Sequence, residues 1–368
     1  MKIALVVAGL PPEALGGAET QAARTAAHLA LRHDVLVFTR TATVPGFLLG
    51  APRCRVVRRS AVRVPVLRFG LDLIQGVARI AAMRRRIDAI VAYQTVIDGL
   101  LAVLAGMLCD RPVLVWVRSE EEFRLRASRQ SRWLSPWVFR HARMIAVQSE
   151  SLRGQLLGEL RSAGRGPLAQ AIAPKIRVIP NGVAIGTSAA GGDPAQVLYV
   201  GRLAADKGVI HLLEAMRRCP QAALTVVGDG PERPRLEAAA RGMVNVRFAG
   251  RCDPDEVPAY MARAGMLVLP SLRNEGLPNV VLEAMAAGVP VIASRNAGIP
   301  DLISDRETGL LVEPGDADGL ARGIGSLVAD SGLRERIRAN AHERVGRYGW
   351  PAVVAAIEDA LGAIARPA

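Results

Sequence analysis

The stretch MLVLPSLRNEGLPNVVLEAMAAGVPVIAS, residues 266–294, contains a strand, a loop, a helix and the start of another strand. The apolar run Met266–Leu269 predicts a buried strand, because a short apolar run bounded by turn residues is typical of a parallel sheet. Pro278 and Gly288 mark the two ends of the helix, since proline favours the first helical turn and glycine the position just past the last one. The stretch therefore predicts one unit of an α/β fold.

The loop in this stretch carries a glutamate just before the helix, and a second glutamate lies within the helix. Backbone N–H groups around Gly276–Val280 have no acceptor within the helix, so this helix start suits a phosphate group. Glu275 precedes the helix and Glu283 follows eight positions later. One carboxylate can reach a sugar beyond the phosphates while the other accepts hydrogen bonds from ribose hydroxyl groups. The alternative is a pair of surface carboxylates beside an ordinary turn.

The same alternation of apolar runs and helical patterns extends through all 368 residues. Aromatic residues make up only 4% of the chain, which favours packing through Ala, Val, Leu and Ile in buried parallel strands. The predicted strands are Lys2–Ala8, Asp34–Phe38, Arg55–Val57, Ala89–Ala92, Val113–Val117, Met144–Val147 and Ile176–Ile179 in one series, and Val197–Val200, Leu224–Val227, Val246–Phe248, Met266–Leu269, Val289–Ala293 and Leu310–Val312 in a second. Two series predict two doubly wound parallel-sheet domains.

Small residues between the two series mark a linker. Residues 184–196 contain Gly191-Gly192 and Pro194, which are typical of a segment between domains. We therefore expect a Rossmann-like domain over residues 1–183, a linker over 184–196 and a second Rossmann-like domain over 197–348. A last helix is expected within residues 349–368, where Pro351 suits its first turn.

Three further loops follow strands of the second series, at the sheet edge where open α/β folds bind ligands. The loop that begins Gly201-Arg202-Leu203 also contains Lys207-Gly208, and both cations suit a diphosphate. Gly228-Asp229-Gly230-Pro231 predicts a tight turn, and Gly250-Arg251 follows the next strand, where its backbone could face a nucleotide base. The alternatives are solvated cations and turns with a structural role alone.

In the first half, Gly16-Gly17-Ala18-Glu19 ends the loop after the first strand and opens a helix. Glycine allows the backbone to approach a phosphate because no Cβ atom stands in the way. The segment lacks the G-x-G-x-x-G spacing of a dinucleotide-binding fingerprint, which argues against a nicotinamide cofactor.

Together these segments resemble the retaining glycosyltransferases of the GT-B fold, in particular family 4 (glycosyl transferases group 1). The residues that carry the resemblance are Gly16–Glu19, Asn181–Val183, Gly201–Leu203, Lys207-Gly208, Gly228–Pro231, Glu275–Val291 and Thr308–Val312. Its most specific part is the spacing of Glu275 and Glu283. The resemblance implies two Rossmann-like domains that face each other across a cleft, with the last helix crossing back onto the first domain.

The resemblance also implies a role for each site residue. Catalysis would depend on Glu275, which contacts the transferred sugar, and on Arg202 and Lys207, which hold the donor diphosphate. Glu283 would bind the ribose. The other donor contacts would come from Gly17, Leu277, Pro278 and Asn279 at the diphosphate and from Gly228 and Arg251 at the base. The implied reaction transfers a sugar from a nucleotide-diphosphate donor with retention of configuration, without a metal ion or other cofactor.

One position departs from the family pattern. Many relatives place a histidine that contacts the donor sugar after the strand corresponding to Val113–Val117. Here the chain continues Arg118-Ser119-Glu120-Glu121-Glu122. Arg118 and Glu120 are the candidates for the role of this histidine, and Gly276 is a further candidate for contact with the donor sugar or the acceptor. The alternative for both side chains is a capping or surface role.

The net charge of +13 lies entirely in the first half of the chain. Residues 1–170 hold 25 Lys and Arg against 12 Asp and Glu, whereas residues 171–368 hold 22 of each. Two basic stretches with apolar and aromatic residues, Val64–Arg86 and Phe123–Arg143, suit an anionic membrane surface. A lipid-linked glycan acceptor of cell-envelope or exopolysaccharide synthesis would then fit. The alternative is two ordinary helices with a solvated basic side.

Composition and local patterns also bear on the location of the protein, on metal and nucleic-acid binding, and on alternative functions. Four scattered cysteines and a short N-terminal apolar run indicate a cytoplasmic protein, peripheral on the inner face of the membrane at most. The strings Asp253–Asp255 and Asp316–Asp318 lie at predicted helix starts, where aspartate caps N–H groups, so no metal ion is expected. No nucleic-acid-binding module is recognised, so nucleic acid is not an expected partner. A nucleotide-sugar epimerase on the same fold and a non-catalytic basic binding protein are the alternative functions.

Overall fold

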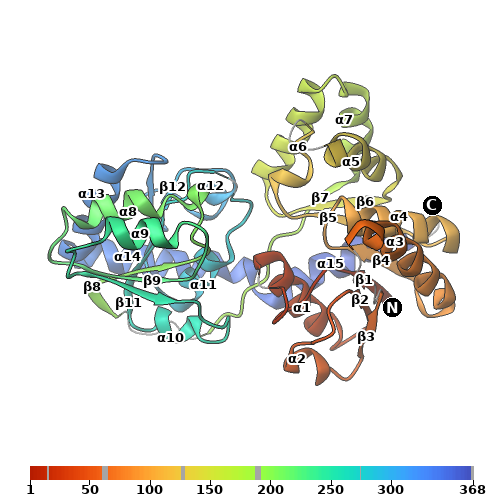
Figure 1. The fold of residues 1–368 in the computed structure, drawn as a ribbon, viewed down its shortest axis with the longest axis horizontal. Coiled ribbons are helices and arrows are strands. Elements are labelled where there is room, and N and C mark those ends of the chain that lie inside the picture. Colours follow the sequence, from red (N-terminus) through yellow and green to blue (C-terminus); the bar gives the residue numbers. More distant parts are fainter. Residues whose placement is uncertain (15, 60–64, 126–128, 187–191, 274, 366–368) are drawn as a thin grey trace. The chain divides into compact units, whose positions relative to one another are not determined.

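A computed structural model of the chain describes residues 1–14, 16–59, 65–125, 129–186, 192–273 and 275–365, without the side chains of residues 65–69, 129 and 130. The chain divides into two compact units, which we call the first and the second domain (Figure 1). The first domain comprises Met1–Gly182 and Trp350–Ala368, and the second comprises Val183–Gly349. Each domain contains a parallel sheet with helices on its faces, which confirms the predicted fold class.

Within the described residues, the sheet of the first domain has seven parallel strands in the order β3-β2-β1-β4-β5-β6-β7. The strands are β1 (Lys2–Val6), β2 (Asp34–Thr39), β3 (Cys54–Arg58), β4 (Ala89–Ala92), β5 (Val113–Val117), β6 (Met144–Val147) and β7 (Ile176–Val178). β4, β5 and β6 are buried along their whole length, as expected for parallel strands with helices on both faces. The strand order reverses between β1 and β4, a point at which α/β sheets commonly bind ligands.

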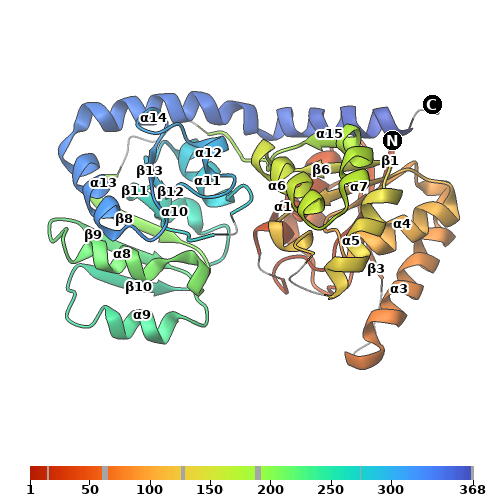
Figure 2. The same ribbon diagram turned by 90° about the horizontal axis from the view of Figure 1, so that it is seen from above.

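Helices cover both faces of this sheet. The described helices are α1 (Gly17–Leu29), α2 (Gly46–Leu49), α3 (Pro65–Ala82), α4 (Ile97–Cys109), α5 (Arg129–His141), α6 (Glu150–Ser162), α7 (Gly166–Ile172) and α15 (Trp350–Ala365), with the 3-10 turns η1 (Arg84–Arg86), η2 (Glu120–Glu122) and η3 (Ala173–Lys175). α1, α2 and α15 pack on one face and α3 to α7 on the other, as Figure 1 shows from the side and Figure 2 from above, with α5 to α7 in front. The basic stretch Phe123–Arg143 therefore contains a helix with an apolar inner side, since Val138 and Phe139 of α5 are fully buried.

The sheet of the second domain has six parallel strands within the described residues, in the order β10-β9-β8-β11-β12-β13. The strands are β8 (Asp193–Val200), β9 (Ala223–Val227), β10 (Val246–Gly250), β11 (Ala264–Leu269), β12 (Val291–Ser294) and β13 (Leu310–Val312). β8 begins four residues before the apolar run at Val197, inside the segment predicted as a linker. Asp193 is in register with Ala264 and Gln196 with Ala223, so pairing between backbones extends the strand beyond its apolar part.

Helices again surround this second sheet. They are α8 (Val209–Met216), α9 (Arg233–Ala239), α10 (Val257–Met261), α11 (Asn279–Ala287), α12 (Ile299–Leu302), α13 (Ala317–Ala329) and α14 (Ser331–Val345), with the turns η4 (Ala205–Lys207) and η5 (Gly346–Tyr348). The predicted ends of the helix in residues 266–294 are confirmed. Pro278 precedes the first residue of α11, and Gly288 follows the last with a left-handed φ of 74°.

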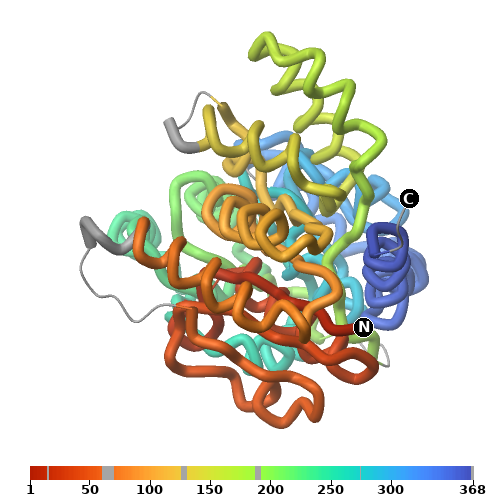
Figure 3. Tube along the Cα trace, turned by 90° about the vertical axis from the view of Figure 1, so that its right-hand side faces the viewer, coloured from red at the N-terminus to blue at the C-terminus, as the bar shows by residue number. Residues whose placement is uncertain are grey.

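The C-terminal helix α15 packs on the first domain, so both chain ends belong to that domain (Figure 3). Its first residue, Trp350, stacks on His28 of α1 with ring centroids 4.3 Å apart. Gly182 lies against the Trp350 ring, and a Cβ atom at Gly182 would be 2.4 Å from a ring carbon. Glu358 extends the contact, with its Oε1 atom 2.8 Å from His33 Nε2. The predicted return of the last helix to the first domain is confirmed.

Candidate active site

In the second domain, the loops that follow β8, β9 and β11 are hydrogen-bonded to one another at the carboxyl edge of the sheet. Leu203 N, in the loop after β8, donates to Asp229 O in the loop after β9 at 2.9 Å. Leu272 N, in the loop after β11, donates to Asp206 O in the loop after β8 at 2.7 Å. The sheet order reverses between β8 and β11, so this edge has the topology of a ligand site.

An ion pair joins two of the predicted site residues at this edge. Lys207, at the end of η4, places its Nζ atom 2.6 Å from Glu275 Oε1. Ser271 Oγ donates to the same oxygen at 2.5 Å. Gly208 has a φ of 62°, and a Cβ there would lie 2.2 Å from Pro270 O, so glycine allows the two loops to pack closely. Among the described residues, no other side chain pairs with the Lys207 ammonium or the Glu275 carboxylate.

The Lys207–Glu275 ion pair is largely buried, but part of it is exposed to solvent. Glu275 as a whole is 7% exposed, and the side chain of Lys207 is 22% exposed. Gly298 N donates to Glu275 O at 3.0 Å, which fixes the backbone of the glutamate against the segment after β12. The pair is therefore a rigid, partly solvated ion pair, and its ammonium keeps N–H groups for a further anion.

Arg202 and Tyr199 complete this cluster. The Arg202 side chain is exposed and has no hydrogen-bond or ion-pair partner among the described residues. Tyr199 is fully buried on β8 and its hydroxyl donates to Arg202 O at 3.0 Å. Burial raises the pKa of Tyr199, and the negative charges of Glu275 and Asp206 raise it further, so the hydroxyl stays a neutral donor. Sequence reasoning missed Tyr199, because its position within an apolar strand resembles that of a core residue.

The start of α11 lies next along the same segment. Pro278 precedes the helix with extended backbone angles and makes no side-chain capping hydrogen bond of its own. Leu277 is buried, whereas Gly276 and Asn279 are half-buried. Glu283 lies on the second turn and is also half-buried. Three of the predicted diphosphate contacts, Leu277, Pro278 and Asn279, and the predicted ribose contact Glu283 thus lie on the segment that also carries Glu275.

The predicted base contacts lie on the neighbouring strands of the same edge. Gly228, after β9, has a φ of 139°, and a Cβ there would lie 1.9 Å from Gly201 O, so the position requires glycine. Its N–H donates to Gly250 O at 2.7 Å, which ties the end of β9 to the end of β10. Arg251 follows β10 and is exposed. The residues predicted for the second domain therefore converge on its carboxyl edge.

In the first domain, Arg118 lies at the carboxyl end of β5 and is almost completely buried, with an exposed fraction of 6%. Its Cζ atom lies 4.7 Å from the ring centroid of Tyr93 and 5.1 Å from that of Trp116. Its Nη2 atom donates to Asn181 Oδ1 at 2.7 Å. Burial lowers the pKa of Arg118, an effect that Tyr93, Glu122 and Glu19 oppose. Arg118 is therefore not a surface arginine.

Glu122 is a site residue that the sequence reasoning missed. Its carboxylate accepts four hydrogen bonds, from the N–H groups of Arg118, Ser119 and Thr95 and from the Thr95 hydroxyl, at 2.7–3.1 Å. Burial raises the pKa of Glu122 to about 7, although these hydrogen bonds favour the ionised form. Glu122 thus fixes the backbone of Arg118. The spacing of Ser119 and Glu122 matches a capping box and could have indicated this role.

Glu120 and Gly17 lie elsewhere in the first domain. Glu120 Oε1 pairs with Arg124 Nε at 2.7 Å in an i, i+4 ion pair on η2 and the segment after it, and the two side chains are 23% and 40% exposed. Gly17 is the first residue of α1, and Gly16 before it is extended, with a φ of −141°. The predicted helix start is confirmed, and Glu19 contributes its charge to Arg118 from the first turn.

Both D-x-D strings lie next to helix starts, those of α10 and α13. Asp316 Oδ1 accepts a hydrogen bond from Gly319 N at 2.8 Å and caps α13. Asp253 N donates to Glu256 Oε2 at 2.7 Å just before α10. The capping interpretation is confirmed for Asp316, whereas the N-cap residue of α10 is Glu256 and the bond at Asp253 comes from its backbone N–H.

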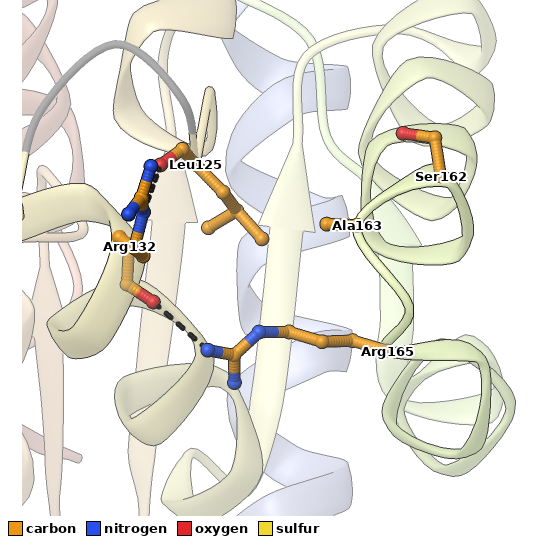
Figure 4. A pocket seen from close by; sticks show the side chains of 5 residues that line it. All are labelled: Leu125, Arg132, Ser162, Ala163 and Arg165. Atoms are coloured by element: carbon orange, nitrogen blue, oxygen red, sulfur yellow. Dashed lines mark hydrogen bonds between the residues drawn. The ribbon is translucent and has the colours of Figure 1, made fainter.

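A separate hollow of about 300 Å³ is found in the first domain (Figure 4). Leu125, Arg132, Ser162, Ala163 and Arg165 line it. Arg165 Nη2 donates to Arg132 O at 3.2 Å, and Arg132 Nε donates to Leu125 O at 3.4 Å. Both guanidinium groups are thus engaged with backbone carbonyls, and none of the predicted site residues lines this hollow.

Two parallel-sheet domains and a last helix that returns to the first of them define the class of proteins with the GT-B fold. Solved structures share this fold. Anabaena Alr3699/HepE in complex with UDP has a TM-score of 0.80 and 21% identity, over 99% of this chain and 100% of that chain. Sucrose-phosphate synthase (tll1590) from Thermosynechococcus elongatus has a TM-score of 0.80 and 25% identity, over 97% of each chain.

The chain belongs to the glycosyl transferases group 1. That family matches residues 185–344, and the glycosyl transferase 4-like domain matches residues 16–182. The phosphatidyl-myo-inositol mannosyltransferase of Mycobacterium leprae (strain TN) is 30% identical over 270 residues, which cover 70% of this chain and 68% of that protein.

Other relatives match over shorter spans. The sulfoquinovosyl transferase SQD2 of Arabidopsis thaliana is 38% identical over 173 residues, 46% of this chain and 34% of that protein. The lipopolysaccharide core biosynthesis glycosyltransferase LpsE of Rhizobium meliloti (strain 1021) is 38% identical over 165 residues, 44% of this chain and 48% of that protein. The chain thus spans less than half of the length of these two relatives.

Proposed function

We propose that the chain is a retaining glycosyltransferase that moves a sugar from a nucleotide-diphosphate donor to a glycan acceptor. The observation that carries this proposal is the ion pair of Lys207 and Glu275 beside the exposed Arg202, at the carboxyl edge of the second sheet. Cations at this edge suit a diphosphate, because α/β sheets receive phosphate groups at the ends of their strands. Membership of the glycosyl transferases group 1 supports the same activity.

The charges of the site match the charge separation of the reaction. As the bond between sugar and phosphate breaks, negative charge grows on the leaving diphosphate and the anomeric carbon becomes cationic. Arg202, Lys207 and the start of α11 stabilise the growing negative charge, which is where an enzyme gains most rate. These groups need no metal ion. Glu275 keeps Lys207 in place and contacts the sugar with its second oxygen.

Retention follows if the acceptor attacks the face from which the phosphate leaves. A phosphate oxygen then takes the proton of the acceptor hydroxyl, so the protein needs no separate base. Glu283 binds the ribose hydroxyls, and Gly228 and Arg251 contact the base. The amides near Leu277–Asn279 bind the diphosphate, as does the backbone at Gly17.

The donor is proposed to be a UDP-sugar or a GDP-sugar. Anabaena Alr3699/HepE, which shares the fold, has been solved in complex with UDP-glucose. A relative from Mycolicibacterium smegmatis, 36% identical over 152 residues, is a GDP-mannose-dependent alpha-(1-6)-phosphatidylinositol monomannoside mannosyltransferase. Both donor classes share the diphosphate that the second domain is proposed to hold.

The acceptor is proposed to be a lipid-linked glycan of the cell envelope or of an exopolysaccharide, reached from the cytoplasmic face of a membrane. Exposed apolar side chains occur on α3, α4 and α5, which contact one another in sequence order. Ile74 is 66% exposed, Leu108 64% and Trp133 69%. Together with the arginines of η1, these side chains suit an anionic lipid surface.

Part of the two basic stretches lies outside the described residues. This holds for Val64 and Arg126, and for the side chains of Val66, Leu67, Arg68, Phe69 and Arg129. Among the helices that the structure describes, none is both long enough and apolar enough to span a membrane. Sedimentation with anionic and neutral vesicles at low and high salt tests the docking proposal, and an absence of salt-sensitive binding to the anionic vesicles would contradict it.

Nucleotide binding tests the proposed donor site. UDP or GDP should raise the Tm, because a ligand at a hundredfold excess over its Kd stabilises the fold by about 2.7 kcal/mol. Lys207→Ala should remove most of this shift. Arg338→Ala is the matched control, since Arg338 also forms a 2.6 Å ion pair, with Glu335 on the surface of α14. The proposal fails if neither nucleotide stabilises the chain, or if Lys207→Ala binds as tightly as the wild type.

A product assay separates transfer from epimerisation, which the same donor pocket could serve. A transferase should convert the donor in step with the acceptor. Conversion of the donor sugar to its epimer without any acceptor would instead favour the epimerase.

A further inference from the structure

Four polar side chains form a row at the carboxyl edge of the first sheet. Tyr93, Arg118 and Gln148 directly follow β4, β5 and β6, and Asn181 follows β7. Asn181 Oδ1 accepts hydrogen bonds from Arg118 Nη2 at 2.7 Å and from Gln148 Nε2 at 3.1 Å. The Tyr93 hydroxyl lies 2.7 Å from Thr25 Oγ1 on α1. Polar residues at neighbouring strand ends of an open α/β sheet are in the position of a ligand site.

Arg118 is the only charged member of this row, and its charge has no ion-pair partner among the described residues. Its Nε and Nη1 atoms are buried and make no hydrogen bond within the part of the chain that the structure describes. The Glu122 carboxylate bonds to the backbone N–H of Arg118 rather than to its guanidinium group. Glu19 on α1 favours the charged form, but it is not paired with Arg118. A buried cation without a carboxylate is costly, so a functional reason for it is expected.

The indole N–H of Trp116 is a second buried donor that would be satisfied by an acceptor from a ligand. Trp116 Nε1 is buried and has no hydrogen-bond partner among the residues that the structure describes, and the Arg118 guanidinium lies over the Trp116 ring. The region around Arg118 therefore contains three N–H-bearing atoms without acceptors. These three atoms lack acceptors among the described residues, and a substrate anion supplies acceptor oxygens.

We propose that Arg118 is a specificity-determining residue that binds an anionic group, a carboxylate, sulfonate or phosphate, on the sugar handled by the first domain. This inference depends on the proposed glycosyltransferase function. The planar guanidinium matches two oxygens of such a group. Binding requires the side chain to move from between Tyr93 and Trp116, because its unpaired nitrogens are covered. Gln148 continues to donate to Asn181 Oδ1 when Arg118 leaves it.

The alternative is a purely structural role, in which the two aromatic rings satisfy the cation. Cation–π contacts with Tyr and Trp are favourable when desolvated. This role predicts that Arg118→Met lowers stability and affects all sugars equally. The anion subsite predicts a loss that depends on the charge of the sugar.

Matched sugar pairs that differ by one carboxylate test the proposal. The donor pairs are UDP-glucose with UDP-glucuronate and GDP-mannose with GDP-mannuronate, and the acceptor pair is methyl glucoside with methyl glucuronide in the presence of the nucleotide. Binding is measured by calorimetry with the full chain and its variants. We expect one pair to show a preference for the anionic member of about tenfold or more, as for a charge-assisted hydrogen bond. The pair that shows it identifies the donor or the acceptor as the source of the anion.

The variants separate the two roles. Arg118→Met should abolish the preference while the affinity for UDP or GDP alone is unchanged. Arg118→Lys should retain part of it, because the charge remains. Arg124→Met is the control, since Arg124 lies on the same segment and its side chain is 40% exposed.

The possible failures can be told apart. If no nucleoside diphosphate binds, the proposed function itself is wrong. If nucleotides bind but no pair favours the anionic sugar, or if Arg118→Met keeps the preference, the function stands and the anion subsite is refuted.

Discussion

Replacing Glu275 by Gln removes one negative charge from the ion pair without changing the size of the side chain. The amide keeps an oxygen that can accept hydrogen bonds from Lys207 and Ser271. In the structure, Lys207 Nζ and Ser271 Oγ lie 2.6 and 2.5 Å from Glu275 Oε1. Breaking a fully buried pair costs about 3–5 kcal/mol, but the Lys207 side chain is 22% exposed and water can solvate it. We therefore expect the free energy of unfolding to fall by only about 1–2 kcal/mol, near the worth of a hydrogen bond to a charged group.

The effect on catalysis should be much larger than the effect on stability. Removing one positioned group that acts in the transition state lowers kcat by about 10²–10³-fold. Glu275 is proposed to contact the sugar, so the affinity for UDP or GDP should change little. The measurements are kcat and KM for transfer, calorimetric binding of the nucleotide, and the Tm.

A control variant isolates the role of the site. Glu335→Gln removes the same charge from a surface pair with Arg338 at 2.6 Å and should leave kcat unchanged. A Glu275→Gln variant that binds the nucleotide and turns over the donor at a rate near that of the wild type would refute the assignment of Glu275.

Three further outcomes follow from particular contacts. Gly228→Ala should weaken nucleotide binding and lower the Tm, because the new Cβ would clash with a backbone oxygen. Gly242 also has a positive φ, of 80°, but has open space around it, so Gly242→Ala should lower the Tm less. Scanning calorimetry compares the two variants. Gly182→Ala should cost about 1–3 kcal/mol in urea unfolding, because its Cβ would overlap the Trp350 ring. Since burial raises the pKa of Glu122 to about 7 from 4.5, the folded state binds the extra proton between these values. Its contribution to stability should therefore fall as pH rises from about 4.5 to 7, and Glu122→Gln should remove this slope from chemical denaturation curves measured across that range.

The sequence predicts most of the fold because its signals are local. Pro278 and Gly288 delimit α11, since each acts through its own backbone geometry. The apolar runs over Ala89–Ala92, Val113–Val117 and Met144–Val147 match β4, β5 and β6 residue for residue, because strands buried on both faces require apolar side chains throughout. The start of β8 at Asp193 differs, because an exposed strand end is set by backbone pairing and leaves no apolar signal.

The site is predictable where one segment or one turn defines it. Glu275 and Lys207 are predicted from their motifs, and the structure brings them to 2.6 Å. The choice among Glu120, Glu121 and Glu122 is different, because three adjacent carboxylates look alike in a sequence. Only the approach of Thr95, which follows β4, shows that Glu122 turns inward, whereas Glu120 pairs with Arg124.

The two domains hold their cations in different ways, and this difference supports an anionic substrate group. Arg202 and Lys207 are proposed to supply positive charge for a diphosphate within the second domain itself, where Glu275 pairs with Lys207. The proposed donor site therefore does not require Arg118 for the diphosphate. Two guanidinium nitrogens of Arg118 lack an acceptor among the described residues, and a carboxylate, sulfonate or phosphate would supply oxygens for them once the side chain moves from between Tyr93 and Trp116. Selection for a charged sugar is thus the role that accounts for a cation at this sheet edge whose guanidinium has no carboxylate partner among the described residues.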